Sequence, residues 1–264
     1  MTHAAFAPVA PIQILEGLYN YSHATFGDYH LLLAHHTIEE EARFRTLFSR
    51  IEADKLLPSA TIIMDNSIVE LGDAVSAEMV KQAYDIIKDS APSLEVIPVL
   101  PDVMGDGNAT RRIIDENYAH WQEAIDPAEG FMAVAQGKDQ DDFEASVTFL
   151  LGGEFEDITW IGIPRILTAS VGSRKAAVEF VKEHYPDINI HLLGFSDNME
   201  DDLACAKIEG VDGIDSAVPL RVEGEFTPTM EVGPRPKNWF EEAIICPQMV
   251  ENLNIVRNTV KAGR

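Results

Sequence analysis

Apolar runs that suit buried strands alternate with amphipathic segments along most of this chain. Seven runs are rich in Val, Ile and Leu, at 29–36, 61–65, 95–101, 130–136, 158–164, 188–195 and 211–218. The segments between them place apolar residues three and four apart, which predicts helices over 38–53, 77–88, 109–124, 141–151, 174–185 and 200–208. Repetition of strand and helix in this order favours a parallel sheet covered by helices.

The length and the repeat together favour a closed barrel. The chain has 264 residues, and a TIM (β/α)8 barrel needs about 250. No glycine-rich dinucleotide fingerprint follows the first strand. We therefore predict an α/β TIM-type barrel in a single domain over 1–264, with an N-terminal extension at 1–28, a long loop at 223–238 and a terminal helix at about 247–260. The eighth strand stays open between 12–18 and 243–246.

Composition limits the compartment and the partners. No apolar run approaches the roughly 20 residues of a membrane span, and no secretory signal begins the sequence, so we expect a cytoplasmic protein with no membrane role. The net charge of -24 argues against nucleic acid, which favours basic proteins. Several basic residues nevertheless follow strands and are expected at one rim, where they would form a positive mouth: Lys138, Arg165, Arg174, Lys175, Arg221, Arg235 and Lys237.

Metal-binding residues are scarce. Cys205 and Cys246 are the only two cysteines, too few for a disulfide framework or a metal knuckle. His35 and His36 follow the first strand, but adjacent strand residues point to opposite faces and no third ligand is evident. We expect a structural or substrate-contact role for the histidine pair, and we expect neither a metal nor a cofactor.

Polar residues end five of the apolar runs. They are Asp65, Asp102, Gln136, Asp215 and the backbone at Gly162. Because strand carboxyl ends share one face of a barrel, these groups are expected to converge there. A carboxylate nucleophile with a second carboxyl as proton donor is a general arrangement for attack on a glycosidic carbon.

The strand around Asp215 carries an acid among small residues. Asp215 shares its face with Gly213 and Ala217, which predicts open space for a substrate. A conformational interpretation also exists for each polar residue. Asp65, Asp102 and Asp215 are of a type that caps helices and turns, and the Gln136–Gly137 pair is common in loops.

The segment GVDGIDSAVPLR resembles the nucleophile segment of the tRNA-guanine transglycosylase family. It matches the family at Gly210, Asp212, Asp215, Pro219 and Arg221, and the similarity continues in order over about 61–221. The resemblance implies that Asp215 is the nucleophile on C1' of a nucleotide and that Asp65 is the general acid and base. It also implies a base-binding set comprising Asp102, Gln136, Gly162 and Asn66.

Two departures from the family narrow this expectation. The cysteine and histidine cluster of a zinc subdomain is missing, and Asp65 is followed by Asn66 and Ser67 where the family has glycines. The chain is therefore most similar to the zinc-free phage-type members that modify DNA, a chemistry related to queuosine and used against restriction.

The resemblance implies a specific reaction and specific partners. Guanine in DNA would be exchanged for a 7-deazaguanine such as 7-cyano-7-deazaguanine, and the target nucleotide would be flipped out or single-stranded. The phosphates would be contacted by Lys138, Arg165, Arg221 and Arg235. Three alternatives stay open: a tRNA substrate, a non-catalytic accessory subunit of the same fold, and an unrelated metal-dependent hydrolase.

Overall fold

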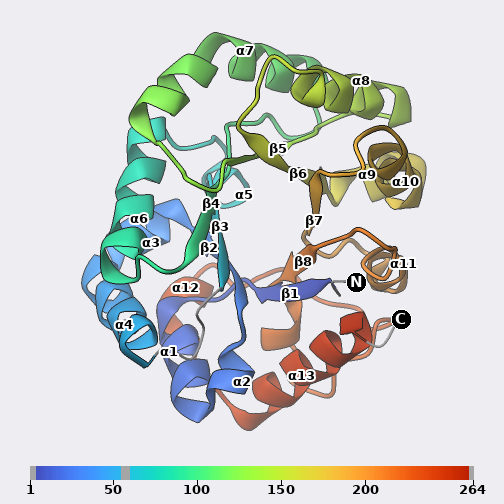
Figure 1. Ribbon diagram of the computed structural model, residues 1–264. Helices are drawn as coiled ribbons and strands as arrows, with labels where there is room; N and C mark the ends of the chain where they lie inside the picture. The colour runs from blue at the N-terminus through green and yellow to red at the C-terminus, as the bar shows by residue number, and fades with distance from the viewer. Residues whose placement is uncertain (1–3, 55–59, 262–264) are drawn as a thin grey trace.

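The computed structural model describes residues 4–54 and 60–261, which fold into a single α/β domain. Within them, eight strands form two parallel arcs, β1-β8-β7-β6-β5 and β2-β3-β4. Bridges from Val9 to Leu31 and from Val99 to Met132 join the arcs, so the strands close into a TIM-type barrel inside a ring of helices (Figure 1). The strands are β1 (Ala5–Pro8), β2 (Tyr29–Leu33), β3 (Thr61–Asp65), β4 (Glu95–Pro98), β5 (Phe131–Val134), β6 (Ile158–Pro164), β7 (Asn189–Leu193) and β8 (Gly213–Ser216).

Helices follow the strands on the outside of the barrel. Most bury one apolar stripe against the sheet, as α6 does with Val80, Ala83 and Ile87. The helices are α1 (Ile12–Tyr21), α2 (His23–Phe26), α3 (Ala34–Glu39), α4 (Glu41–Asp54), α5 (Ile68–Leu71), α6 (Ala77–Ser90), α7 (Gly107–Ala124), α8 (Gln140–Leu151), α9 (Ile166–Val171), α10 (Lys175–His184), α11 (Met199–Cys205), the 3-10 turn η1 (Val218–Leu220), α12 (Trp239–Glu242) and α13 (Pro247–Lys261). None of the helices in the described ranges is long and apolar enough to cross a membrane.

The remaining strand of the barrel is β1, and neither segment considered from the sequence supplies it. Residues 12–18 lie in α1, where Ile12, Leu15 and Leu18 are buried at helical spacing. Residues 243–246 follow α12 without forming a strand. The part of 1–28 that the structure describes is therefore no extension, because β1 pairs with β8 and contacts β2.

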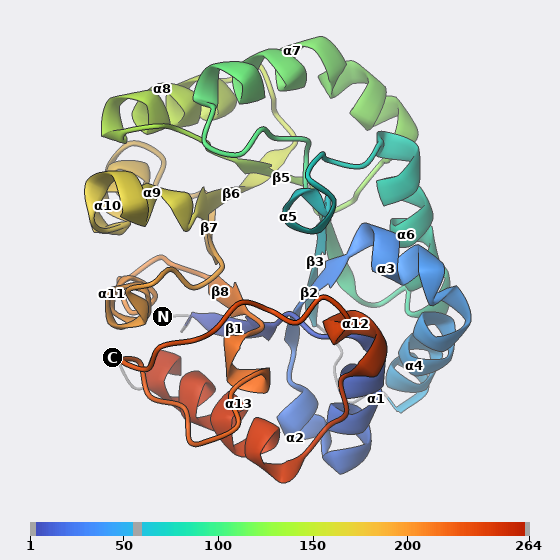
Figure 2. The same cartoon turned by 180° about the vertical axis from the view of Figure 1, so that it is seen from behind.

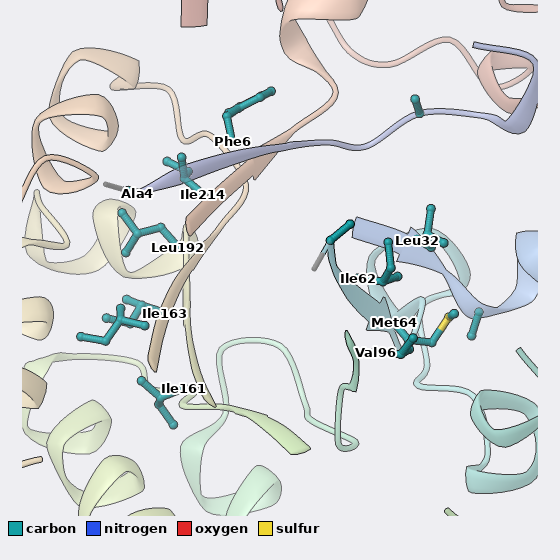
Figure 3. Packing of buried hydrophobic residues seen from close by; sticks show 14 of the residues in the cluster. Ala4, Phe6, Leu32, Ile62, Met64, Val96, Ile161, Ile163, Leu192 and Ile214 are labelled. Atoms are coloured by element: carbon teal, nitrogen blue, oxygen red, sulfur yellow. The ribbon is translucent and has the colours of Figure 1, made fainter. Parts of the chain in front are cut away.

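Side chains alternate between the barrel interior and the helix layer. One cluster fills the interior and includes Leu31, Ile63, Ile97, Val134 and Trp160. The residues between them along the strands point outward to the helices (Figure 3). Because apolar side chains fill the interior, polar groups on the inward face become accessible only near the strand carboxyl ends.

Loops and helix starts surround this end of the barrel. Asp106 accepts from the Ala109 N–H at 2.9 Å and so caps α7. The segment from β8 to α12 is anchored by the buried Asn252 of α13, which accepts from Phe226 N at 2.8 Å and donates to Gly224 O at 2.9 Å. Figure 2 shows this segment and α5 lying over the strand ends.

Candidate active site

Asp215 ends a line of buried polar groups in the barrel interior. Its Oδ1 accepts from Gly194 N and from His191 Nε2, each at 2.9 Å. His191 is fully buried, and its Nδ1 lies 2.6 Å from the Tyr29 hydroxyl oxygen. Three strands, β2, β7 and β8, therefore hold one carboxylate in place.

Tyr29 fills the space beside Gly213. A Cβ placed on Gly213 would lie 2.4 Å from both the Cε1 and the hydroxyl oxygen of Tyr29. The prediction that Gly213 leaves room for a substrate is therefore wrong, since an aromatic ring takes that room. Burial raises the pKa of Tyr29 well above 10.0, and the charges of Asp215 and Asp212 act in the same direction. Tyr29 thus keeps its hydroxyl proton.

Asp65 ends β3 and faces the same mouth. Its Oδ1 accepts from Ser67 N at 2.7 Å. Ser67 is the only non-glycine residue with positive φ, 63°, in the described part of the chain, and such strain concentrates at functional sites. Burial raises the pKa of Asp65 well above its usual 3.8, and the charges of Glu70, Asp102 and Asp215 add to this effect. The carboxyl groups predicted to converge therefore influence one another electrostatically.

Asp102, Asn66 and Gln136 form a closed buried network. Asp102 Oδ1 accepts from Asn66 Nδ2 at 2.8 Å, and its Oδ2 accepts from Gln136 Nε2 at 2.7 Å. Gln136 Oε1 in turn accepts from Gly105 N at 2.9 Å. Burial raises the pKa of Asp102, while its bonds to the two amides act against the rise. These residues are brought together as expected, but their polar atoms are largely engaged with one another and fix the loops after β3, β4 and β5.

Gly162 lies within the sheet. Its carbonyl oxygen accepts from Ala135 N at 3.0 Å. A Cβ there would lie 2.9 Å from Leu193 Cδ1 and 3.3 Å from Val134 Cγ2. The structure therefore places Gly162 in the packed interior, where its backbone bonds a neighbouring strand.

The basic residues predicted at the rim mostly hold loops. Arg165 donates to Phe195 O at 3.2 Å and Arg221 to Gly233 O at 2.6 Å. Arg235 pairs with Glu70 at 2.8 Å, while Lys138 is exposed. Burial, followed by the charges of Arg235 and Arg165, lowers the pKa of Arg221.

The two adjacent histidines are on α3, because β2 ends at Leu33. His36 Nε2 accepts from Ile12 N at 3.2 Å, and burial lowers the pKa of His36 to about 4. His36 is thus a structural residue, in keeping with the favoured interpretation. No group of three or more His, Cys, Asp or Glu side chains within 4–54 and 60–261 could hold a metal ion.

Sequence reasoning missed three residues that organise the site: Tyr29, His191 and Arg174. Arg174 follows β6 and looked like a rim cation, but it is fully buried and donates to Asp202 Oδ1 at 2.7 Å. It also donates to Gly194 O at 3.0 Å, which places the residue whose N–H holds Asp215. A histidine inside the apolar run NIHLL was the one available signal, because a polar residue on the interior face needs a partner.

A hollow of about 610 Å³ lies beside the mouth, and its lining includes Asp102, Val103, Asn117 and Trp121. Its size suits a small molecule. Neither Asp65 nor Asp215 lines it.

Comparison with known proteins gives similarity in structure alone. No family profile and no curated protein sequence matches the chain. A monomeric dihydrodipicolinate synthase variant is 15% identical with a TM-score of 0.51, and the match covers 98% of this chain and 97% of that one. CdNal from Clostridium difficile, solved with mannosamine, is 13% identical with a TM-score of 0.50 over 83% of this chain and 71% of that one. An N-acetylneuraminate lyase from Mycoplasma synoviae is 13% identical with a TM-score of 0.45 over 82% and 68%.

These neighbours establish the fold and overturn the predicted family. The two with TM-scores of 0.50 or more are a dihydrodipicolinate synthase variant and CdNal, and neither is a tRNA-guanine transglycosylase. The predicted resemblance to the tRNA-guanine transglycosylase family is therefore wrong. The predicted base exchange in DNA or tRNA and the accessory-subunit alternative are wrong with it. The same holds for the predicted partners, which were DNA, tRNA and a 7-deazaguanine base. Polar residues at strand ends are a feature of the barrel itself, so their order did not identify a family.

Proposed function

We propose that this protein is an enzyme that performs general acid–base chemistry on a small hydroxyl- or amino-bearing molecule. In this proposal Asp215 accepts a proton from the substrate or from water, and Asp65 donates one to the departing or carbonyl oxygen. The observation that carries the proposal is the presence at one mouth of two carboxyl groups in opposite environments.

The two environments divide the roles of acid and base. Asp215 accepts two N–H hydrogen bonds at Oδ1, so donors from the protein hold this carboxyl group as an acceptor. Asp65 is half-buried, and its burial and the charges of Glu70, Asp102 and Asp215 raise its pKa, which favours the protonated form. Two carboxyl groups in environments that differ in this way commonly serve as the acid and the base of one reaction.

Charge selects the class of substrate. Three carboxyl groups influence Asp65, within a chain of net charge -24, so the mouth favours neutral or cationic molecules with hydrogen-bond donors. The barrel of similar fold solved with mannosamine, an amino sugar, supports this class. A lysine Schiff base is a poorer explanation, because none of the eight strands within the described residues contains lysine.

A turnover screen tests the proposal. A panel of aldoses, amino sugars including mannosamine, and polyols is incubated with the protein, and NMR detects products. We expect one compound to be converted by the wild type, with a loss of at least about 100-fold in Asp215→Asn and in Asp65→Asn, the usual scale for acid–base catalysis. Asp89→Asn is the matched control, because Asp89 is an exposed carboxylate, 66% accessible. Conversion that is equal in all four proteins, or absent across the panel, refutes the proposal.

A further inference from the structure

A continuous line of hydrogen bonds runs from the bottom of the barrel interior to Asp215. The Tyr29 hydroxyl lies 2.6 Å from His191 Nδ1, and His191 Nε2 lies 2.9 Å from Asp215 Oδ1. Tyr29 is 5% exposed and His191 is 0% exposed, so water does not compete for these bonds. The ring of Tyr29 also stacks on Trp160, with centroids 6.3 Å apart.

The positions of the protons in the Tyr29–His191–Asp215 line follow from Asp215 at one end and Tyr29 at the other. A carboxylate only accepts, so His191 Nε2 donates to Asp215. Tyr29 keeps its hydroxyl proton, and His191 Nδ1 is the acceptor within 2.6 Å of it. A proton on Nδ1 would leave the Tyr29 O–H buried without an acceptor, which folded proteins avoid. His191 is therefore the neutral Nε2–H tautomer.

The same contacts distinguish the two oxygens of Asp215. Oδ1 accepts from His191 and from Gly194 N. Oδ2 accepts no hydrogen bond from a residue that the structure describes. It is also not one of the fully buried polar atoms that lack a hydrogen-bond partner, so it has some exposure to solvent. Oδ2 is thus the oxygen that reaches the accessible mouth.

We infer that Tyr29 and His191 are positioning residues that fix the Asp215 carboxylate and leave Oδ2 as its reacting oxygen. The inference rests on the proposed function, in which Asp215 is the base. A carboxylate base that two hydrogen-bond donors already hold in one orientation needs little reorientation when a substrate binds, which is the advantage of preorganisation. Gly213 belongs to this arrangement, since a Cβ at that position would lie 2.4 Å from the Tyr29 ring and hydroxyl oxygen.

Two measurements on the full chain test the inference without any substrate. The first is two-bond 1H–15N correlation of the histidine rings at pH 7, with His191 assigned by its loss in His191→Leu. We expect Nε2 protonated and Nδ1 unprotonated. In Tyr29→Phe, which keeps the ring, the Nδ1 signal should move toward that of an unbonded ring nitrogen. A protonated Nδ1 in the wild type, or an Nδ1 signal unchanged in Tyr29→Phe, overturns the inference.

The second measurement is carboxyl labelling at pH 6 by a water-soluble carbodiimide with glycine ethyl ester, read by peptide mass spectrometry. At this pH the reagent modifies carboxyl groups that it can reach. We expect Asp215, which is 6% exposed, to be unlabelled in the wild type and labelled several-fold more in His191→Leu, because loss of the His191 donor frees Oδ1 and lets the carboxylate turn toward the mouth.

His30→Leu is the matched control, since His30 is equally buried on β2 but contacts Gly27 O at 3.2 Å. It should leave Asp215 unlabelled. Equal labelling of Asp215 in wild type and His191→Leu overturns the inference, and Tyr29→Phe gives an independent answer if His191→Leu does not fold. The turnover of Asp65→Asn reports separately on the proposed function: an unchanged turnover together with the expected Asp215 result removes the proposed acid and leaves the positioning role intact.

Discussion

Arg174→Met should destabilise the protein strongly and loosen the support of Asp215. The Arg174 guanidinium is fully buried and pairs with the buried Asp202 at 2.7 Å. It also donates to the carbonyl oxygens of Ile163 at 3.3 Å, Leu193 at 3.2 Å and Gly194 at 3.0 Å. One side chain therefore holds together the carboxyl ends of β6 and β7.

The magnitude follows from the charge that the substitution leaves behind. Methionine fills a similar volume, but Asp202 stays buried without its cation, and removal of one partner from a buried pair costs about 3–5 kcal/mol. Asp202 still accepts from Ser196 N at 2.6 Å and from the Ser196 hydroxyl at 2.9 Å, which favours the lower half of that range. A typical domain has a total stability of only about 5–15 kcal/mol, so the loss is large.

Equilibrium unfolding in urea at pH 7 measures the effect. The control is Lys175→Met, which removes the neighbouring cation from a pair with Glu179 whose side chains are 64% and 60% exposed. Exposed pairs contribute less than about 1 kcal/mol. A loss below about 1 kcal/mol for Arg174→Met, or equal losses for the two variants, would show that the buried pair does not hold these strands.

Three further predictions concern single residues. Asp65→Asn should stabilise the fold at pH 7, because the folded pKa of Asp65 is raised and the contribution of Asp65 to stability is lost as pH rises above about 4. Urea unfolding should show that the stability gained by the substitution shrinks toward pH 4. A lower stability of Asp65→Asn at pH 7 would contradict this prediction. Burial lowers the folded pKa of His36 to about 4 from 6.5, so the unfolded chain binds a proton first and stability should fall as pH is lowered from 6.5 to 4. His36→Gln should flatten this dependence of stability on pH. An unchanged pH dependence in His36→Gln would refute the prediction. Gly213→Ala should lower stability by about 1–3 kcal/mol through overpacking against Tyr29, measured by thermal unfolding, with an unchanged melting temperature as the contrary result.

Much of the fold could be predicted from periodicity. The runs at 61–65 and 158–164 coincide with β3 and β6, because continuous apolar residues between polar loops define a buried parallel strand. The first strand could not be predicted, since three of the four residues of Ala5–Pro8 are Ala or Pro, which are depleted in strands, and the stronger apolar pattern belongs to α1. Its pairing with β8 shows that it is a strand.

The site was predictable where position along a strand decides it. Asp65, Asp102, Gln136 and Asp215 end apolar runs, and the hydrogen bond from Gln136 to Asp102 shows that two of them meet. Their partners were not predictable, because the contact between Tyr29 and His191 joins residues 162 positions apart.

The family was misassigned for a related reason. Short motifs at strand ends record where the barrel opens, and many unrelated chemistries share that place. The spacing of such residues therefore predicted the mouth of the barrel correctly and its reaction wrongly.

The most direct test of the central claim is the protonation of Asp65 at pH 6. Carboxyl 13C signals, assigned with Asp65→Asn, distinguish acid from carboxylate. We predict that Asp65 is protonated, since burial and the negative charges of Glu70, Asp102 and Asp215 raise its pKa. An ionised Asp65 would contradict the account.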